Sequence, residues 1–243
     1  MSATVVDVSP RGERVSCVLA GDFVIPRLVR REGRSVEVAL VAGRAMLLPG
    51  DAVRIEISVG EGCTLRLVDV GGLVVYGRPG ETGEPSHWHA RIDLAEGAHL
   101  GWQGLPTVIT DAGHLTRSLT VRLAADSSAT LRETLVLGRS GERGGRVTTE
   151  TDAADAIGPI LRDRLEVNGA EPVPGVLGTD RIVDSILALG DRSGLADVPG
   201  AARLDFERGG AMLRYLGEAL HQSPFEGAGM GAVLLEPRPA AVF

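Results

Sequence analysis

The segment from Leu131 to Glu142 presents charged side chains in an apolar strand and in the turn that follows it. Glu133 lies inside the apolar part, whereas Arg139 and Glu142 lie in the glycine-rich turn. Alternate residues of a strand share a face, so Glu133 is expected on the same side as Leu135 and the other neighbouring leucines. Two carboxylates on either side of an arginine suggest one of two functions, guiding a cation or holding a partner.

A carboxylate on an apolar strand face is costly unless it has a charged partner or lies in a water-filled channel. We expect Arg139 to pair with Glu133 across a neighbouring turn. We expect Gly138 and Gly141 to shape that turn, because glycine adopts turn conformations freely. Two interpretations stay open from these residues, a buried ion pair that fixes the fold and a path for cations.

Two histidines form a second candidate site. If this stretch is a strand, His87 and His89 share a face and their imidazoles can bind one metal ion, with His114 supplied by a neighbouring unit. The pair resembles half of a cupin metal motif, so a cupin-like metal-binding enzyme is an alternative function. Asp93 stands where that motif has Glu, and the second half of the motif is missing.

The sequence contains no recognisable set of catalytic residues. None of the 25 basic residues is a lysine, so a P-loop lysine and a Schiff-base lysine are both impossible. The Gly-x-Ser-x-Gly and His-Glu-x-x-His motifs are also absent. We therefore expect that this chain is not an enzyme, and that any nucleotide hydrolysis linked to its function comes from a partner.

The 243 residues have the composition of a globular protein, with 44% apolar and 23% charged residues. A formal net charge of −7 argues against a nucleic-acid partner. Cys17 and Cys63 are too few for a disulfide framework and suit a reducing compartment. The sequence shows no signal-peptide core and no apolar run of the ~20 residues that a membrane helix needs, so we expect a cytoplasmic protein.

Alternating apolar residues predict β-strands in the first two thirds of the chain, for example at 36–40, 53–59 and 65–67. A weak strand-turn-strand repeat aligns Val59, Leu94 and Leu123, which lie 35 and 29 residues apart, with two extra residues in the third turn. Units that cannot bury their own faces must stack on their neighbours. This favours an irregular β-solenoid or a layered β-sandwich, although ordinary antiparallel hairpins would give a similar pattern.

The last third of the chain predicts two helices. At residues 180–189 the apolar side chains have helical spacing, with Thr179 or Asp180 as a cap and Gly190 at the end. The second helix is predicted at residues 211–221. The predicted fold is therefore mainly β, an irregular β-helix-like or layered β-sheet stack, with two helices in the C-terminal third.

No linker divides the chain, so residues 1–243 are predicted to form a single domain. The tail at residues 224–243 is rich in Gly, Pro and Ala. We expect this tail to be flexible or to become ordered on a partner.

Many short features, taken together and in order, resemble the UreD family of urease accessory proteins, also called UreH. The similarity covers roughly Leu40 to Asn168. Its features are Leu-Pro-Gly-Asp at 48–51, Gly-Glu-Gly at 60–62, Val75-Tyr76, Gly-Ala-His-Leu-Gly-Trp at 97–102, Pro-Thr-Val-Ile at 106–109, Glu133, Gly138-Arg139 and Gly141-Glu142.

The resemblance implies a β-helix-like stack of sheets with two helices and a function that is not catalytic. Members act as scaffolds that, with UreF and the GTPase UreG, bind apo-urease in a dimeric hetero-complex and help to deliver nickel to its active site. No cofactor is bound permanently, and Ni²⁺ is in transit through an internal polar tunnel. On this resemblance Glu133 and Glu142 contribute to the nickel path. Gly138, Arg139 and Gly141 position the turn.

Four positions depart from the family pattern. The family has Gln near Val70, Lys near Val74, Glu where Leu105 stands and Phe where Arg143 stands. If those groups line the metal route, this chain lines it differently. Scattered carboxylates suit transit, because clustered imidazoles and thiolates hold nickel tightly.

The apolar residues of the tail suggest a partner surface. Met230, Val233, Leu234 and Leu235 lie late in a loose segment and, with the two predicted helices, would bind UreF. A third class of function is a β-solenoid interaction module without a metal role, whose partner binding would be indifferent to nickel and to the acidic positions.

Overall fold

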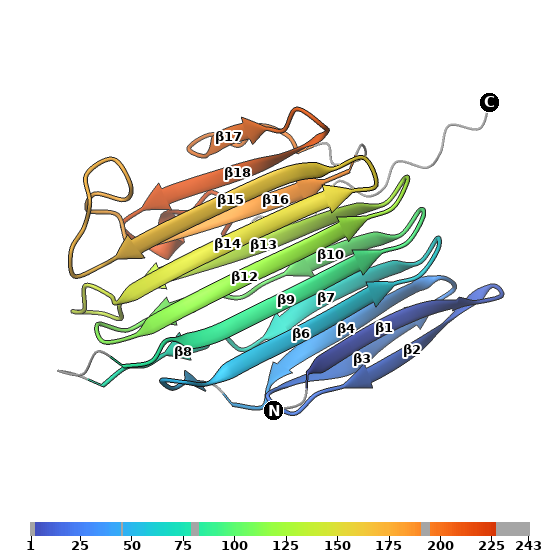
Figure 1. Cartoon of the computed structure of the whole chain (residues 1–243), viewed down its shortest axis with the longest axis horizontal. Coiled ribbons are helices and arrows are strands. Elements are labelled where there is room, and N and C mark those ends of the chain that lie inside the picture. The colour runs from blue at the N-terminus through green and yellow to red at the C-terminus, as the bar shows by residue number, and fades with distance from the viewer. Residues whose placement is uncertain (1–2, 45, 79–82, 191–194, 227–243) are drawn as a thin grey trace.

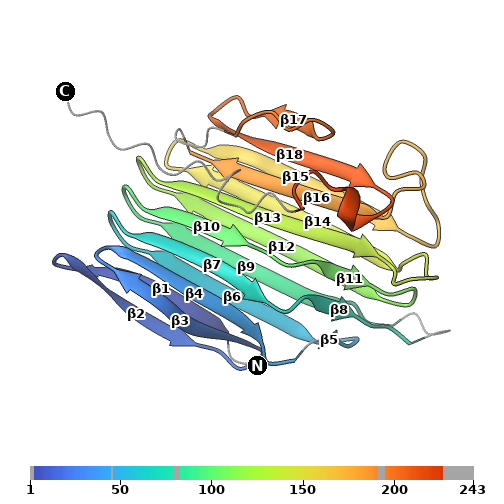
Figure 2. The same ribbon diagram turned by 180° about the vertical axis from the view of Figure 1, so that it is seen from behind.

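The computed structural model describes residues 3–44, 46–78, 83–190 and 195–226. In this part of the chain, β-strands form two sheets that lie face to face (Figures 1 and 2). The N-terminal strands lie at one end of the stack and the C-terminal strands at the other (Figure 1). The prediction of a mainly β fold of stacked sheets is confirmed.

One sheet has seven strands among the described residues. In spatial order they are β15 (Pro159–Asn168), β14 (Arg146–Asp155), β12 (His114–Leu123), β9 (Ser86–Leu94), β6 (Ala52–Val59), β1 (Thr4–Arg11) and β2 (Arg14–Ala20). The other sheet has eleven strands in the same part of the chain. Eight of them follow the order β17 (Ala202–Asp205), β18 (Gly210–Gly217), β16 (Ile182–Leu189), β13 (Ser128–Leu137), β10 (His99–Gln103), β7 (Thr64–Val70), β4 (Ser35–Ala42) and β3 (Val24–Glu32). The short strands β5 (Met46–Leu47), β8 (Leu73–Val75) and β11 (Thr107–Ile109) complete it, and β11 pairs with the end of β13.

Parallel pairing gives the stack the character of a β-solenoid. Strands β1, β6, β9, β12 and β14 are parallel in one sheet, as are β4, β7, β10 and β13 in the other. The chain crosses between the sheets through tight turns, so that each coil lies on the one before. Val59, Leu94 and Leu123 are direct neighbours across the parallel strands, which confirms the repeat.

The three turns of this repeat have the same length. Thr64, His99 and Ser128 begin the strands that follow the turns, and they pair directly with one another. The two extra residues expected in the third turn are therefore wrong, because they belong to β13. Ordinary antiparallel hairpins are excluded for these three units, since their strands pair in parallel with the neighbouring coils.

The interior between the sheets is filled by apolar side chains at matching positions. Val6, Ile57, Ile92, Val121 and Ala153 form one row across five parallel strands, and each is at most 1% exposed. Burial of one large aliphatic side chain contributes roughly 1.5–3 kcal/mol, so such rows hold the coils together. Charged side chains inside this apolar interior therefore need a specific explanation.

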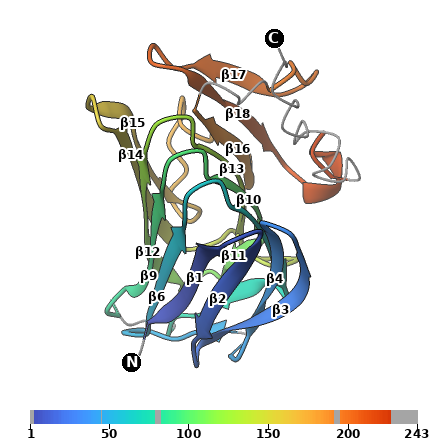
Figure 3. The same cartoon turned by 90° about the vertical axis from the view of Figure 1, so that its right-hand side faces the viewer.

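The N-terminal end of the stack is closed by the first strands (Figure 3). Thr4 Oγ1 on β1 donates a hydrogen bond of 2.7 Å to the carbonyl of Val24 on β3 and so links the two sheets. Phe23 packs into the core beside them and is 5% exposed.

Ion pairs join the sheets at the C-terminal end. Arg208, in the turn between β17 and β18, pairs with Asp155 of β14 at 2.6 Å. Arg214 of β18 pairs with Asp163 of β15 at 2.8 Å. Here charged side chains bridge the two sheets, whereas at the other end apolar packing closes the gap.

The first predicted helix is a strand. Residues 182–189 form β16, and all eight positions are buried. Val183 and Leu187 face the main core, whereas Ile186 and Ala188 face a second core on the outer side of the sheet. Because both faces are covered, apolar residues occur at nearly every position, and the run fits a helical spacing by chance.

The second predicted helix is also wrong. Residues 210–217 form β18, in which Met212 faces the main core and Leu213 faces the second core. In the part of the chain that the structure describes, only residues 220–222 are helical, as a single 3₁₀ turn. No helix in the described residues is long and apolar enough to cross a membrane.

Candidate functional site

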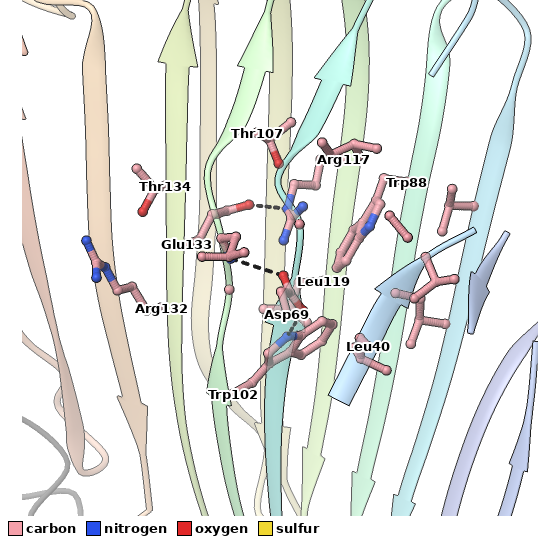
Figure 4. A pocket seen from close by; sticks show the side chains of 18 of the residues that line it. Leu40, Asp69, Trp88, Trp102, Thr107, Arg117, Leu119, Arg132, Glu133 and Thr134 are labelled. Carbon is pink, nitrogen blue, oxygen red and sulfur yellow. Dashed lines mark hydrogen bonds and ion pairs between the residues drawn. The ribbon is translucent and has the colours of Figure 1, made fainter. Parts of the chain in front are cut away.

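Glu133 points into the space between the two sheets, as its alternation with the leucines predicts (Figure 4). It lies on β13 and forms an ion pair with Arg117 of β12, in the opposite sheet. The Glu133 and Arg117 side chains are 31% and 16% exposed, so both charges are largely removed from solvent. Glu133 Oε1 is buried and accepts no hydrogen bond of normal geometry from the described residues, which leaves the guanidinium to neutralise it.

Arg117 is held against an aromatic ring. It is the direct neighbour of Trp88 in the register of β12 and β9, and its guanidinium carbon lies 3.5 Å from the centre of the Trp88 ring. This is a cation–π contact, which is strengthened where water is excluded. Arg117 stands at an inward position between Leu115 and Leu119, so the alternation that identified Glu133 was also available for this residue.

Asp69 of β7 is a second carboxylate inside the stack. Trp102 Nε1 donates a hydrogen bond of 2.9 Å to Asp69 Oδ1, and the backbone N–H of Leu105 donates one of 3.1 Å to Oδ2. Burial raises the pKa of the Asp69 carboxyl above its ordinary value, although both hydrogen bonds and the charge of Arg117 act in the opposite direction. Sequence reasoning missed Asp69, which continues the inward positions of Leu65 and Leu67.

A glycine lies between the two carboxylates, at a place where the neighbouring backbone comes too close for a side chain. Gly104 follows β10 at the level of Asp69 on β7 and of Glu133 on β13. A Cβ atom at Gly104 would lie 2.5 Å from the carbonyl oxygen of Arg132 and 3.7 Å from Asp69 Oδ2. The cavity here has a volume of about 80 Å³, enough for more than one water molecule.

Polar residues continue from Glu133 along the stack. Ser185 of β16 is the direct neighbour of Glu133, and Arg214 of β18 is the direct neighbour of Ser185. Arg214 Nε donates a hydrogen bond of 3.1 Å to Ser185 Oγ, and the same guanidinium pairs with Asp163 of β15. We call Asp69, Glu133, Ser185 and Arg214 the polar row. It leads from the middle of the stack to its C-terminal end.

The glycine-rich turn after β13 is a separate unit. Glu142 accepts hydrogen bonds from the backbone N–H of Arg139 at 2.8 Å and from its guanidinium at 2.6 and 3.0 Å. These bonds hold the pKa of Glu142 below its ordinary value. Gly138 and Gly141 have φ angles of 72° and 83°, in the left-handed region that favours glycine. All four residues therefore shape the turn.

The expected pairing of Arg139 with Glu133 is wrong. Arg139 pairs with Glu142 and lies over the ring of Tyr76, 5.4 Å from its centre, whereas Glu133 lies between the sheets. Glu142 lines a second cavity of about 400 Å³, together with residues 166–169, 172–173 and 176–181. The two glutamates therefore do not line one cavity.

The histidines lie apart from the inter-sheet cavity. The rings of His87 and His89 stack at 5.8 Å, and His89 Nδ1 shares a hydrogen bond of 2.6 Å with Ser118 Oγ. Burial lowers the pKa of His89, and the nearby His87 acts in the same direction. No group of three His, Cys, Asp or Glu side chains among the described residues could hold a metal ion, so the structure does not support the cupin-like site with His114.

A buried polar cluster fixes the C-terminal segment, and sequence reasoning missed it. Asp184 of β16 is fully buried and accepts hydrogen bonds from Arg132, Thr134 and Ser223. Arg132 contributes two of these bonds, at 2.8 and 3.1 Å, and also pairs with Glu226 at 2.6 Å. The signal was Asp184 itself, a charged residue within a run that is otherwise almost wholly apolar.

The segment that this cluster holds precedes the predicted partner-binding residues. Phe225 packs into the second core and is 1% exposed. Met230, Val233, Leu234 and Leu235 lie outside the described residues.

Comparison with known proteins gives a consistent result. A sequence model of the family described as "UreD urease accessory protein" matches residues 20–223. "Urease accessory protein UreD 1" of Streptomyces griseus subsp. griseus is 42% identical over 198 residues, which cover 81% of this chain and 76% of the relative. "Urease accessory protein UreD" of Frankia alni is 36% identical over 208 residues, covering 76% and 69%, and that of a Parafrankia species is 32% identical over 211 residues, covering 77% and 70%. The matched region includes the cavity and the polar row, and the chain belongs to the UreD family of urease accessory proteins.

Proposed function

We propose that this protein is a urease maturation scaffold that binds apo-urease together with UreF and UreG and delivers nickel through its interior. Membership of the UreD family supports the maturation role. The observation that supports the nickel route is the polar row within an otherwise apolar core. Nickel in this proposal is the cargo of the protein.

The carboxylates and the hydroxyl group of the polar row suit a cation that passes through. Carboxylates and hydroxyl groups bind nickel less tightly than clustered imidazoles and thiolates, so they release it more readily. Asp69 on β7 and Glu133 on β13 lie on either side of the line of β10. At this level of the sheet β10 is followed by Gly104, which has no side chain. In the proposal, UreG supplies nucleotide hydrolysis, since this chain has no lysine for a P-loop.

The test is urease activation in cells. The urease subunits, UreF and UreG are co-expressed with and without this chain, and urea hydrolysis and urease nickel content are measured. We expect activation only when the chain is present, and a several-fold loss with Asp69→Asn or Glu133→Gln. Glu150→Gln, on the outer face of β14, is the matched control and should leave activation unchanged.

Three outcomes would contradict parts of this proposal. Activation without the chain would remove the maturation role. Full activation by both interior variants would exclude the nickel route and favour a scaffold without a metal role. Glu142→Gln tests whether the larger cavity belongs to the route: we expect reduced nickel content, and unchanged content would restrict the route to the inter-sheet cavity.

The proposed UreF surface needs revision in one part. The predicted helices do not exist, and β16 is buried throughout, so it offers no surface. We propose that Met230, Val233, Leu234 and Leu235 contact UreF. Truncation after Glu226 keeps the buried Phe225 and the Arg132–Glu226 pair, and we expect it to weaken co-purification with UreF. Undiminished complex formation would exclude the tail.

A further inference from the structure

The inter-sheet cavity already contains a cation that belongs to the protein. Asp69 and Glu133 face the cavity, and the guanidinium of Arg117 lies between the Trp88 ring and the Glu133 carboxylate (Figure 4). The charge of Arg117 also acts on Asp69. Arg44 and Arg132 also line the cavity, but Arg44 lies over the Phe23 ring and Arg132 pairs with Asp184 and Glu226, so the cation paired with Glu133 is Arg117.

Arg117 has fewer polar partners than Arg132 and Arg181. Arg132 donates three hydrogen bonds to carboxylate oxygens, and Arg181 donates three to backbone carbonyls. Among the described residues, the contacts of Arg117 are the ion pair with Glu133 and the face of Trp88. A guanidinium has five N–H donors, and this arrangement uses few of them. Such a side chain can leave its position without breaking a network.

We propose that Arg117 is a displaceable plug, whose guanidinium holds the cation position beside Glu133 and Asp69 until a divalent metal ion takes its place at the carboxylates. The inference rests on the proposed function for the identity of the cation as Ni²⁺. It adds to that function a residue that controls when the route is open.

Electrostatics makes the two cations competitors. A divalent ion balances the charge of the two carboxylates, whereas the same ion with the guanidinium still in place adds a positive charge that they do not balance. Like charges a few ångströms apart repel strongly where water is excluded.

The tryptophans provide a direct readout of this cavity. The chain has two tryptophans, Trp88 and Trp102, and both line the cavity with ring centres 5.9 Å apart. Open-shell metal ions quench tryptophan fluorescence at short range. Titration of the full chain with Ni²⁺ therefore reports entry into the cavity without a label and without urease.

The central comparison is wild type against Arg117→Met, which removes the charge and keeps a flexible apolar side chain. We expect the tryptophan fluorescence of Arg117→Met to be quenched at a nickel concentration at least about tenfold lower than that of wild type, because the competing guanidinium charge is gone. Arg117→Met/Glu133→Gln should lose this gain. Arg91→Met, an exposed arginine on β9 that pairs with Asp93, is the matched control and should titrate as wild type.

Two further sets of variants separate displacement of Arg117 from nickel binding elsewhere and from loss of folding. Each titration is repeated with His87→Ala/His89→Ala, so that nickel on the outer face of β9 does not count as entry. Arg117→Lys keeps Glu133 paired and so protects folding, but an ammonium group lacks the planar stacking on Trp88. We expect it to be quenched at a lower nickel concentration than wild type. It replaces Arg117→Met if that variant does not fold.

The outcomes distinguish the plug from the proposed function. Equal titrations for wild type, Arg117→Met and Arg117→Lys would overturn the plug, even if urease activation depends on the chain. Tighter quenching in the variants, with urease activation that does not need the chain, would keep the plug and remove the maturation role.

Discussion

Buried charges in this molecule are compensated in two different ways. Asp184 is surrounded by donors from three residues, one of which is the bidentate Arg132. Glu133 has an ion pair with Arg117, and its Oε1 accepts no hydrogen bond of normal geometry within the described chain. A fully satisfied network fixes one conformation, whereas a partly satisfied pair leaves other arrangements accessible. This contrast indicates a structural role for Asp184 and supports the proposed role of Glu133 in the cation route.

The Asp184 network should dominate the stability of the C-terminal segment. Asp184→Ala removes the buried carboxylate partner of Arg132 and leaves the more exposed Glu226, and loss of one partner of a buried pair costs up to about 3–5 kcal/mol of unfolding free energy. Urea denaturation monitored by tryptophan fluorescence measures this loss. In the Arg132→Met/Asp184→Ala variant the loss should be smaller than the sum of the single losses. Asp93→Ala on the outer face should change little, and an equal loss there would contradict the role of burial.

Titration of Asp69 should contribute to the pH dependence of the free energy of unfolding. Burial raises its pKa, so between the ordinary and the raised pKa the folded chain binds a proton that the unfolded chain has released. The free energy of unfolding therefore falls as pH rises through this window. Asp69→Asn removes this contribution, so the stability of wild type relative to Asp69→Asn should decline with rising pH. A difference that is flat or increases with pH would contradict the assignment. Asp93→Asn is the control.

The inward direction of Glu133 could be predicted from sequence, but its partner could not. Alternation along one strand decides which face a side chain takes. The partner, Arg117, comes from the opposite sheet, and this contact depends on how the coils stack. Arg139 was the nearest arginine in sequence after the strand, yet a local bond with Glu142 satisfies it.

At the scale of elements, the turns of the repeat depend on one left-handed residue each. Gly62, Gly97 and Asp126 precede the second strands of three successive coils, with φ angles of 60°, 61° and 54°. Asp126 is the one non-glycine residue with positive φ in the described chain. Side chains other than glycine are disfavoured in this conformation, and aspartate is among the better tolerated ones.

Substitutions at Gly97 and Asp126 should change the free energy of unfolding differently. Gly97→Ala forces a Cβ atom into the left-handed conformation and should lower the free energy of unfolding by roughly 1 kcal/mol. Asp126→Gly should leave it unchanged or raise it by less than ~1 kcal/mol, since relief of the conformation is offset by entropy of the unfolded chain. Thermal unfolding of both variants, with Glu96→Ala as control, is the measurement. A marked loss of stability in Asp126→Gly would show that the aspartate side chain itself stabilises the turn.

The strands of the first two thirds could be predicted because one face of each is exposed, so polar and apolar residues alternate. The elements of the last third could not, for a physical reason. A second core covers the outer face of β16 and β18, so Ile186 and Leu213 are as buried as the residues on the inner face. Period-two alternation disappears when both faces are covered, and the remaining apolar run matches a helix equally well.

At the scale of the whole molecule, the stack has protected middle coils and exposed ends. Each coil contacts its neighbours, so stability is shared along the stack, and the end strands have a neighbour on one side. We expect amide hydrogen exchange to be slowest in β9, β12 and β13 and fastest in β2, β3 and β17. Exchange measured by mass spectrometry on proteolytic peptides tests this. Equal protection of all strands would contradict an additive stack and indicate a single cooperative unit.

The stacked fold could be predicted from the repeat, but the change from parallel to antiparallel strand pairing could not. Val59, Leu94 and Leu123 identify neighbouring coils, because the same register position needs the same kind of side chain. After β14 the chain returns antiparallel along both sheets, and no repeat marks that change.

The parallel register also determines how this chain has to reach its native state. The spacing of Val59, Leu94 and Leu123 means that a strand of the stack pairs with a strand about thirty residues away in sequence. The entropy cost of closing that loop therefore precedes the stabilisation that strand pairing gives to each coil. High contact order of this kind makes folding slow. During synthesis, the newest coil presents an unpaired strand edge until β15 and β16 emerge from the ribosome and pair antiparallel with β14 and β13. The nascent chain is therefore most prone to aggregate before its last third is made, and its yield will depend on chaperones that protect open edges.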